Sequence, residues 1–161
     1  MIKANTIRDE ICELALMQYN KKYVHGSMGP DTFDCAGLVW YIYYYFYHEN
    51  IFYKGYGKST TTMIMTSKYG IITLGNDLSI LNNGDIVLFH RQSLKDNIPK
   101  IDNKYPGHCG IYLGDNYFIH ASGTEKRVLV SSFNNEYWVK KLVASKDIVS
   151  DFEKKNFSLI N

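Results

Sequence analysis

Cys35 stands in the sequence context best suited to nucleophilic chemistry. It follows Asp34 and precedes two small residues, Ala36 and Gly37, in the segment TFDCAGLVWYIYYYFYHEN (residues 32–50). Asp34 is a favourable N-cap, so a helix is expected to begin at Cys35. The unpaired N–H groups and the dipole at a helix N-terminus stabilise a thiolate, and the Cys35 N–H could donate to an oxyanion. The two small residues would leave room for a substrate carbonyl beside the sulfur.

The same segment is also consistent with an inert cysteine. The carboxylate of Asp34 disfavours a neighbouring thiolate, so activation of Cys35 requires a base. Free cysteines are among the most buried residue types, and on this local pattern alone a buried thiol is the simpler interpretation.

A candidate base comes from a predicted hairpin around the turn sequence GDN (residues 114–116). His108 lies before this turn and His120 lies after it, on what should be adjacent strands. If the loop has two residues, Gly114 pairs with Tyr117 and the two histidines face opposite sides of the hairpin.

A three-residue loop gives a different register. It pairs Leu113 with Tyr117 and places His120 opposite Gly110, which shares a face with His108 because side chains alternate along a strand. Gly and Asn tolerate the left-handed conformation of such loops, so we predict this register. His108 could then take the proton of the cysteine while His120 holds the His108 ring, which is the logic of a catalytic triad.

The elements that must position these residues follow from periodicity and caps. Residues 6–19 have helical spacing behind a capping pair, Thr6 and Asp9, and residues 24–34 read as a loop. The next helix begins at Cys35, and residues 59–70 suggest another short helix.

From residue 84 onward the pattern changes to short β-type runs. GDIVLFHR, HCGIYLG, NYFIHAS, RVLVSS and YWVKKLVA are separated by turn residues and predict five to six antiparallel strands. Helices followed by antiparallel strands indicate an α+β fold. We expect a single domain over residues 1–161, with its core at about 6–148 and a weakly determined tail at 149–161.

Composition excludes several classes of protein. The formal net charge is +2, from 18 basic and 16 acidic side chains, which is too weak to argue for nucleic acid, a partner for which a clustered basic face is expected. The three cysteines have neither a disulfide-framework pattern nor a zinc-ligand spacing. No stretch approaches the ~20 apolar residues of a membrane helix, and no signal peptide is visible.

Four blocks together resemble the NlpC/P-sixty family of bacterial cell-wall cysteine peptidases, a papain-like group. These are YVHGSMGPDTFDCAGLVWY around the cysteine, LNNGDIVLFH, GHCGIYLGDNYFIHASG around both histidines, and YWVKKLVASKDI at the end. They occur in the family's order, and the resemblance as a whole covers about residues 6–148. The resemblance implies a papain-like fold, with N-terminal helices packed on the C-terminal sheet.

The resemblance also implies roles for individual residues. Cys35 would be the nucleophile, His108 the general base and then acid, and His120 the orienting residue. The Tyr23 hydroxyl and the Cys35 N–H would form the oxyanion-binding and substrate-binding group. His25, Asp34 and Ser122 also belong to this group. His25 stands where an aromatic residue is common, and it would either line the groove or be an exposed loop residue. Asp34 and Ser122 would support the local structure. No metal or cofactor is implied.

Three further features depart from the family pattern. Ala36 replaces a more common serine. Cys109 replaces a small aliphatic residue and by alternation should pack in the core. The insert after His90 (residues 91–107) is long and could form a wall of the groove.

The implied reaction is hydrolysis of peptidoglycan stem peptides, at the bond between γ-D-glutamyl and the diamino acid. Alternatives are an amidase, acyltransferase or interbacterial effector on the same fold, and a non-catalytic wall-binding module. The implied site of action is the cell wall outside the membrane. A phage-type lysin, a piece of a longer secreted or tail-associated protein, and a chain whose signal has been removed all fit the sequence.

Overall fold

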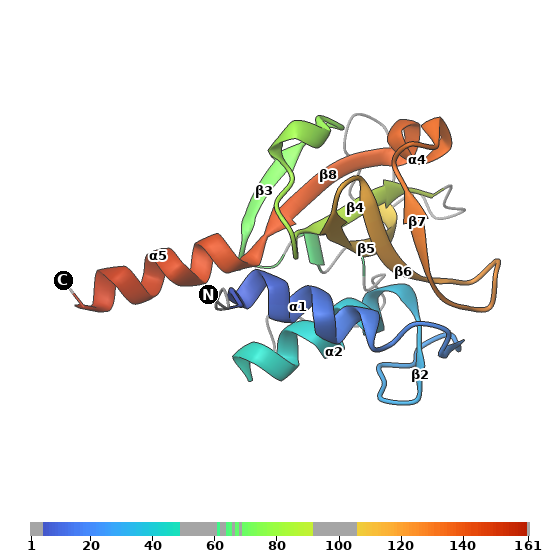
Figure 1. The fold of residues 1–161 in the computed structure, drawn as a ribbon, viewed down its shortest axis with the longest axis horizontal. Coiled ribbons are helices and arrows are strands. Elements are labelled where there is room, and N and C mark those ends of the chain that lie inside the picture. Colours follow the sequence, from blue (N-terminus) through green and yellow to red (C-terminus); the bar gives the residue numbers. More distant parts are fainter. Residues whose placement is uncertain are drawn as a thin grey trace.

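The structure, a computed structural model, describes residues 5–48, 61, 64–65, 67, 69–91 and 106–160, without the side chains of residues 156–160 (Figure 1). It has the expected α+β architecture. Helices α1 (Ile7–Leu16) and α2 (Cys35–Tyr47) lie together against a curled sheet, while α5 (Ile148–Ile160) extends away from the body of the domain. A 3₁₀ turn, η1 (Leu78–Ile80), and helix α4 (Glu136–Lys141) lie between α2 and α5 in the chain.

The sheet has eight strands in the order β2-β1-β7-β6-β5-β4-β8-β3. Their bounds are β1 Lys22–Tyr23, β2 Thr32–Phe33, β3 Ile71–Leu74, β4 Ile86–His90, β5 Pro106–Gly114, β6 Tyr117–Ser122, β7 Arg127–Ser132 and β8 Leu142–Asp147. We expected five to six antiparallel strands, and the sheet has more. β1 and β2 have two residues each, too few for a visible alternation pattern, and they pair in parallel.

The prediction of a strand over YWVKKLVA was wrong for its first part, YWVKK. Glu136–Lys141 forms helix α4, and β8 begins only at Leu142. The Asn135 side chain accepts a hydrogen bond from the Tyr137 N–H, which caps the helix. This cap turns the chain before it enters the sheet and brings the aromatic residues of α4 over one face of the strands.

The N-terminal helices agree better with the prediction. Thr6 and Asp9 form a reciprocal capping box at α1, which ends at Leu16 rather than at residue 19. Helix α2 begins at Cys35 behind Asp34, as expected. Of the predicted helix 59–70, the described Thr61, Ile64 and Met65 are helical and most other positions lie outside the described residues, as do residues 92–105 of the insert.

Two apolar clusters occupy the two faces of the sheet. Leu38, Val39, Ile42 and Tyr43 of α2 are fully buried in the larger cluster, which contains residues from the facing strands β4, β5 and β6. The second cluster is centred on aromatic side chains of β4, β6 and the β7–α4 connection, against which Trp138 packs. Apolar burial on this scale, at roughly 25 cal/mol per Å², holds α2 and therefore its N-terminus against the sheet.

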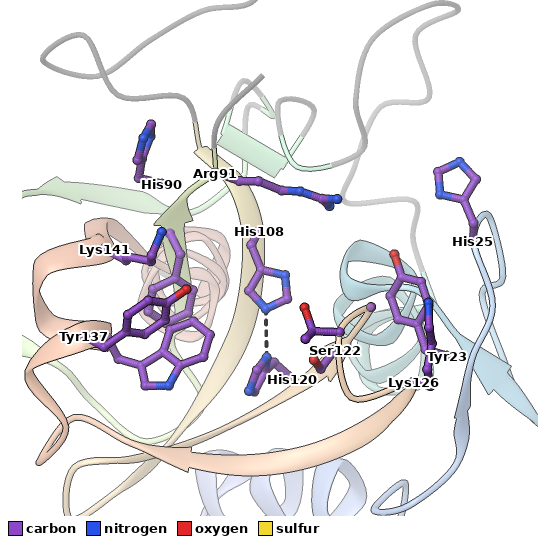
Figure 2. A pocket seen from close by; sticks show the side chains of 14 residues that line it. Tyr23, His25, His90, Arg91, His108, His120, Ser122, Lys126, Tyr137 and Lys141 are labelled. Carbon is purple, nitrogen blue, oxygen red and sulfur yellow. Dashed lines mark hydrogen bonds between the residues drawn. The ribbon is translucent and has the colours of Figure 1, made fainter. Parts of the chain in front are cut away.

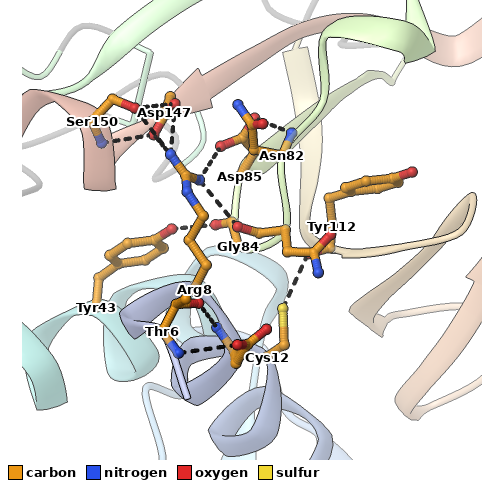
Figure 3. Close-up of polar contacts among 12 residues, drawn as sticks. Thr6, Arg8, Cys12, Tyr43, Asn82, Gly84, Asp85, Tyr112, Asp147 and Ser150 are labelled. Atoms are coloured by element: carbon orange, nitrogen blue, oxygen red, sulfur yellow. Dashed lines mark hydrogen bonds and ion pairs between the residues drawn. The ribbon is translucent and has the colours of Figure 1, made fainter. Parts of the chain in front are cut away.

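A polar network joins α1 to the strands and to α5 (Figure 3). The Arg8 guanidinium donates to Asp85 at 3.1 Å and to both oxygens of Asp147 at 2.9 Å. It also contacts Ser150 Oγ at 3.0 Å and the Asn83 carbonyl at 3.1 Å. These residues come from distant parts of the chain, so Arg8 links elements that no local signal brings together.

Candidate active site

The hairpin that carries both histidines combines features of the two predicted registers. Gly114 pairs with Tyr117 across a two-residue turn, so the predicted pairing of Leu113 with Tyr117 was wrong. A register shift between Tyr112 and Gly114 then restores the expected alignment, with Tyr112 opposite Phe118. The extra residue of this β-bulge has the same effect on the strands as a longer loop.

As a result, His108 on β5 and His120 on β6 face each other (Figure 2). His108 Nε2 lies 2.8 Å from His120 Nδ1. Gly110 makes this possible, because a Cβ at that position would lie 2.6 Å from the Ile119 carbonyl oxygen and 3.1 Å from His120 Cβ. The predicted placement of the two histidines on one face is confirmed.

The environment of His120 keeps its ring neutral. The side chain is buried, and burial together with the nearby His108 lowers the pKa of His120 to about 3. Its Nε2 lies 2.9 Å from Ser131 Oγ on β7. His120 is therefore held between two polar partners, as expected of a residue that orients another ring.

Aromatic side chains fix the two histidines in place. The Trp138 ring centroid lies 5.0 Å from that of His120 and 6.2 Å from that of His108. Phe118 lies 5.0 Å from His120, and Phe89 lies 5.9 Å from His108. This packing restricts rotation of both histidine rings.

Cys35 is the first residue of α2, so its backbone N–H has no acceptor within the helix. Side-chain hydrogen bonds with Cys109 and His108 lower the pKa of the partly exposed Cys35 thiol well below its ordinary value, although burial acts in the opposite direction. Burial raises the pKa of Cys109, which keeps its proton and can donate to the Cys35 sulfur. Cys109 lies in the core as predicted, and it also contacts the candidate nucleophile.

Asp34 and Gly37 shape the helix start rather than the substrate space. Asp34 accepts hydrogen bonds from the Gly37 N–H at 2.6 Å and from the Gly26 N–H at 3.0 Å. A Cβ at Gly37 would lie 2.0 Å from the Ser27 carbonyl oxygen, and Ala36 is buried in the core. The expectation that these small residues clear space for a scissile carbonyl was wrong, because the loop before α2 occupies that space.

The three remaining candidates line a pocket of about 480 Å³ beside the histidines (Figure 2). Tyr23 is half-buried, and burial, followed by the nearby Cys35, raises the pKa of its phenol. His25 is exposed at the pocket rim, and the buried Ser122 accepts from the Glu125 N–H at 3.0 Å, which stabilises the β6–β7 turn. Cys35 is not among the residues that line this pocket.

The family model for the NlpC/P60 family matches residues 20–147, which include Cys35, His108 and His120. The chain belongs to the NlpC/P60 family. Its relatives include the probable endopeptidase YafL of Escherichia coli K12, 28% identical over 83% of this chain and 47% of that protein. The probable peptidoglycan endopeptidase LytE of Bacillus subtilis 168 is 29% identical over 77% of this chain and 29% of its own length. This NlpC/P60 chain therefore spans less than half the length of these curated relatives.

Solved structures of NlpC/P60 proteins have the same fold. NlpC1 of Trichomonas vaginalis superposes with a TM-score of 0.67 at 26% identity, covering 92% of this chain and 46% of that chain. The NlpC/p60 domain of the peptidoglycan hydrolase SagA gives a TM-score of 0.62 at 22% identity, covering 88% of this chain and 99% of that chain. The papain-like fold is thus established for this NlpC/P60 chain.

Two residues of this NlpC/P60 site were not found from the sequence. Ser131 was assigned only to a strand, although its polarity beside apolar Val130 on β7 was a weak signal. Trp138 was assigned to a strand and lies on α4 instead. Within the described ranges, no three His, Cys, Asp or Glu residues are grouped to hold a metal ion, and no helix is long and apolar enough to cross a bilayer.

Proposed function

We propose that this chain is a cysteine endopeptidase that hydrolyses peptidoglycan stem peptides at the cell wall, outside the cytoplasmic membrane. The names of its relatives support this proposal, since they include a probable peptidoglycan endopeptidase and a murein DD-endopeptidase. We further propose the bond between γ-D-glutamyl and the diamino acid as the one cleaved, and residues 6–148 as the catalytic unit.

One observation carries the cysteine mechanism. His108 Nε2 lies 2.8 Å from His120 Nδ1, and His108 also interacts with the Cys35 thiol, where it helps to lower the thiol pKa. A nucleophile, a base and an orienting residue in this arrangement can perform acyl transfer without a metal. A non-catalytic wall-binding module has no need of such an arrangement.

The proposed reaction has two steps. The Cys35 thiolate attacks the peptide carbonyl, and the oxyanion accepts hydrogen bonds from the Cys35 N–H and the Tyr23 hydroxyl. His108, having taken the thiol proton, donates it to the leaving amine. Water, deprotonated by His108, then hydrolyses the acyl-enzyme and releases the acid.

The test is incubation with purified muropeptides under reducing conditions, followed by mass spectrometry of the products. We expect new products that correspond to cleavage within the stem, and none with the Cys35→Ala variant. Intact stem peptides after incubation with the folded wild type would refute the peptidase proposal. Release of ammonia, or transfer of the acyl group to an added amine, would identify the amidase or acyltransferase alternative.

A further inference from the structure

Three cationic side chains line the pocket beside the histidines: Arg91, Lys126 and Lys141. The described residues that line it include no Asp or Glu. The chain as a whole is nearly balanced, with 18 basic and 16 acidic side chains, so this concentration of one charge is local. A concave surface with charges of one sign raises the local concentration of oppositely charged groups.

These cations have no ion-pair partner in the described part of the chain. The neighbouring Lys140 reaches Glu136 at 3.9 Å, whereas Lys141 lies over the Tyr137 ring with Nζ 4.9 Å from its centroid. Lys126 lies in the β6–β7 turn with a φ of 63°. The ammonium groups of Lys126 and Lys141 are therefore available to bind an anionic group of a ligand.

The cations flank the catalytic histidines rather than gathering at one point. In Figure 2, Lys141 lies on the α4 side of the His108–His120 pair, and Lys126 lies on the Tyr23 side. Arg91 follows β4 and extends above His108 toward the Tyr23 side. A peptide whose scissile amide reaches His108 would thus have a cation available on each side.

We propose that this pocket selects stem peptides that carry a free carboxylate on each side of the scissile amide. Lys141 binds one carboxylate, and Lys126 with Arg91 binds the other. The inference rests on the proposed function and specifies its substrate: peptides with free acids are preferred to the same peptides with amidated side carboxyls.

The test uses synthetic stem peptides of one sequence, with a free acid or a primary amide at the residue before the scissile bond and at the residue after it. Steady-state kcat and KM are measured for the wild type, Lys141→Gln, Lys126→Asn and the control Lys140→Gln. Asn is chosen at position 126 because it tolerates the left-handed backbone there. Circular dichroism verifies that each variant is folded.

We expect the wild type to prefer each free acid by about fivefold to tenfold in kcat/KM, mainly through KM, since charge-assisted contacts at a partly exposed site are of this size. Lys141→Gln should abolish the preference at one position, Lys126→Asn should reduce it at the other, where Arg91 remains, and Lys140→Gln should retain both. Equal cleavage of acids and amides by the wild type, or preferences that are unchanged in both variants, would overturn the inference.

A binding measurement separates this inference from the proposed function. Calorimetric titration of Cys35→Ala with the same peptides should give tighter binding of the acids, weakened by salt. In that background this preference should be lost at one position with Lys141→Gln and reduced at the other with Lys126→Asn. If the wild type cleaves none of the peptides but this pattern holds, the hydrolase proposal fails and the carboxylate pocket stands. If acids and amides bind equally, the carboxylate pocket is refuted.

Discussion

His108 Nε2 lies 2.8 Å from His120 Nδ1, and this contact determines where the protons of the site reside. Because the pKa of His120 is lowered to about 3, its ring is neutral and carries one N–H. We assign that hydrogen to Nε2, which donates to Ser131 Oγ at 2.9 Å. His120 Nδ1 then accepts from His108 Nε2, and the other nitrogen of His108 is left for the Cys35 proton.

The three cysteines should differ in reactivity toward iodoacetamide. The pKa of Cys35 is lowered by its hydrogen bonds, whereas burial raises the pKa of Cys12 to about 11 and that of Cys109 well above its ordinary value. Peptide mapping after brief labelling near neutral pH should find Cys35 modified first. Labelling of Cys35 no faster than of the other two would contradict its assignment as an activated nucleophile.

Replacement of the two histidines should reduce turnover to different extents. His108→Ala removes the proton carrier and should lower kcat on the order of 1,000-fold. His120→Ala removes only the orienting partner and should cost less, on the order of 100-fold. Both are measured on the muropeptide substrate with folded variants. A larger loss for His120→Ala than for His108→Ala would reverse the two assigned roles.

Cys109 should support the thiolate of Cys35. In Cys109→Ala the main hydrogen bond that lowers the pKa of Cys35 is lost, so the midpoint of Cys35 alkylation should rise by about one pH unit, the equivalent of one hydrogen bond. Cys109→Ser retains a donor and is the matched control. An unchanged midpoint in Cys109→Ala would mean that His108 alone lowers the pKa.

Protonation of His120 should contribute to acid destabilisation. Its folded pKa of about 3 lies below the ordinary value of 6.5, so its contribution is fully present above pH 6.5 and is lost as the pH falls toward 3. Burial raises the pKa of Asp85 to about 6. Protonation of Asp85 therefore increases the stability of the folded state as the pH falls from about 6 to about 4, which opposes the effect of His120. Urea unfolding across this range should show a smaller loss of stability on acidification for His120→Gln than for the wild type. If the free energy of unfolding falls equally with pH in both proteins, His120 does not contribute to acid destabilisation.

Arg8 should be important for stability and not for catalysis. Arg8→Met leaves Asp85 and Asp147, whose side chains are only 4% and 16% exposed, without their cation. Loss of one partner of such a buried network should lower the free energy of unfolding by about 2–4 kcal/mol in urea titrations. The exposed pair of Lys140 and Glu136 provides the control, since Lys140→Met should change stability by less than about 0.5 kcal/mol. Equal effects of the two substitutions would contradict the role of Arg8.

The sequence by itself determined the local features of this site. The Asp34 cap and the start of α2 at Cys35 depend on residues that are adjacent in the chain, and so they could be predicted. The common face of His108 and His120 also follows from alternation within a single hairpin, although a bulge rather than a longer loop produces it.

Only the tertiary structure decided which distant residues complete the site. Cys109 meets Cys35 because α2 packs on β5, and Ser131 reaches His120 because β7 pairs with β6. Trp138 covers the histidines because α4 turns back over the sheet before β8. Such contacts depend on strand order and on side-chain packing between segments far apart in sequence, where periodicity and caps carry no information.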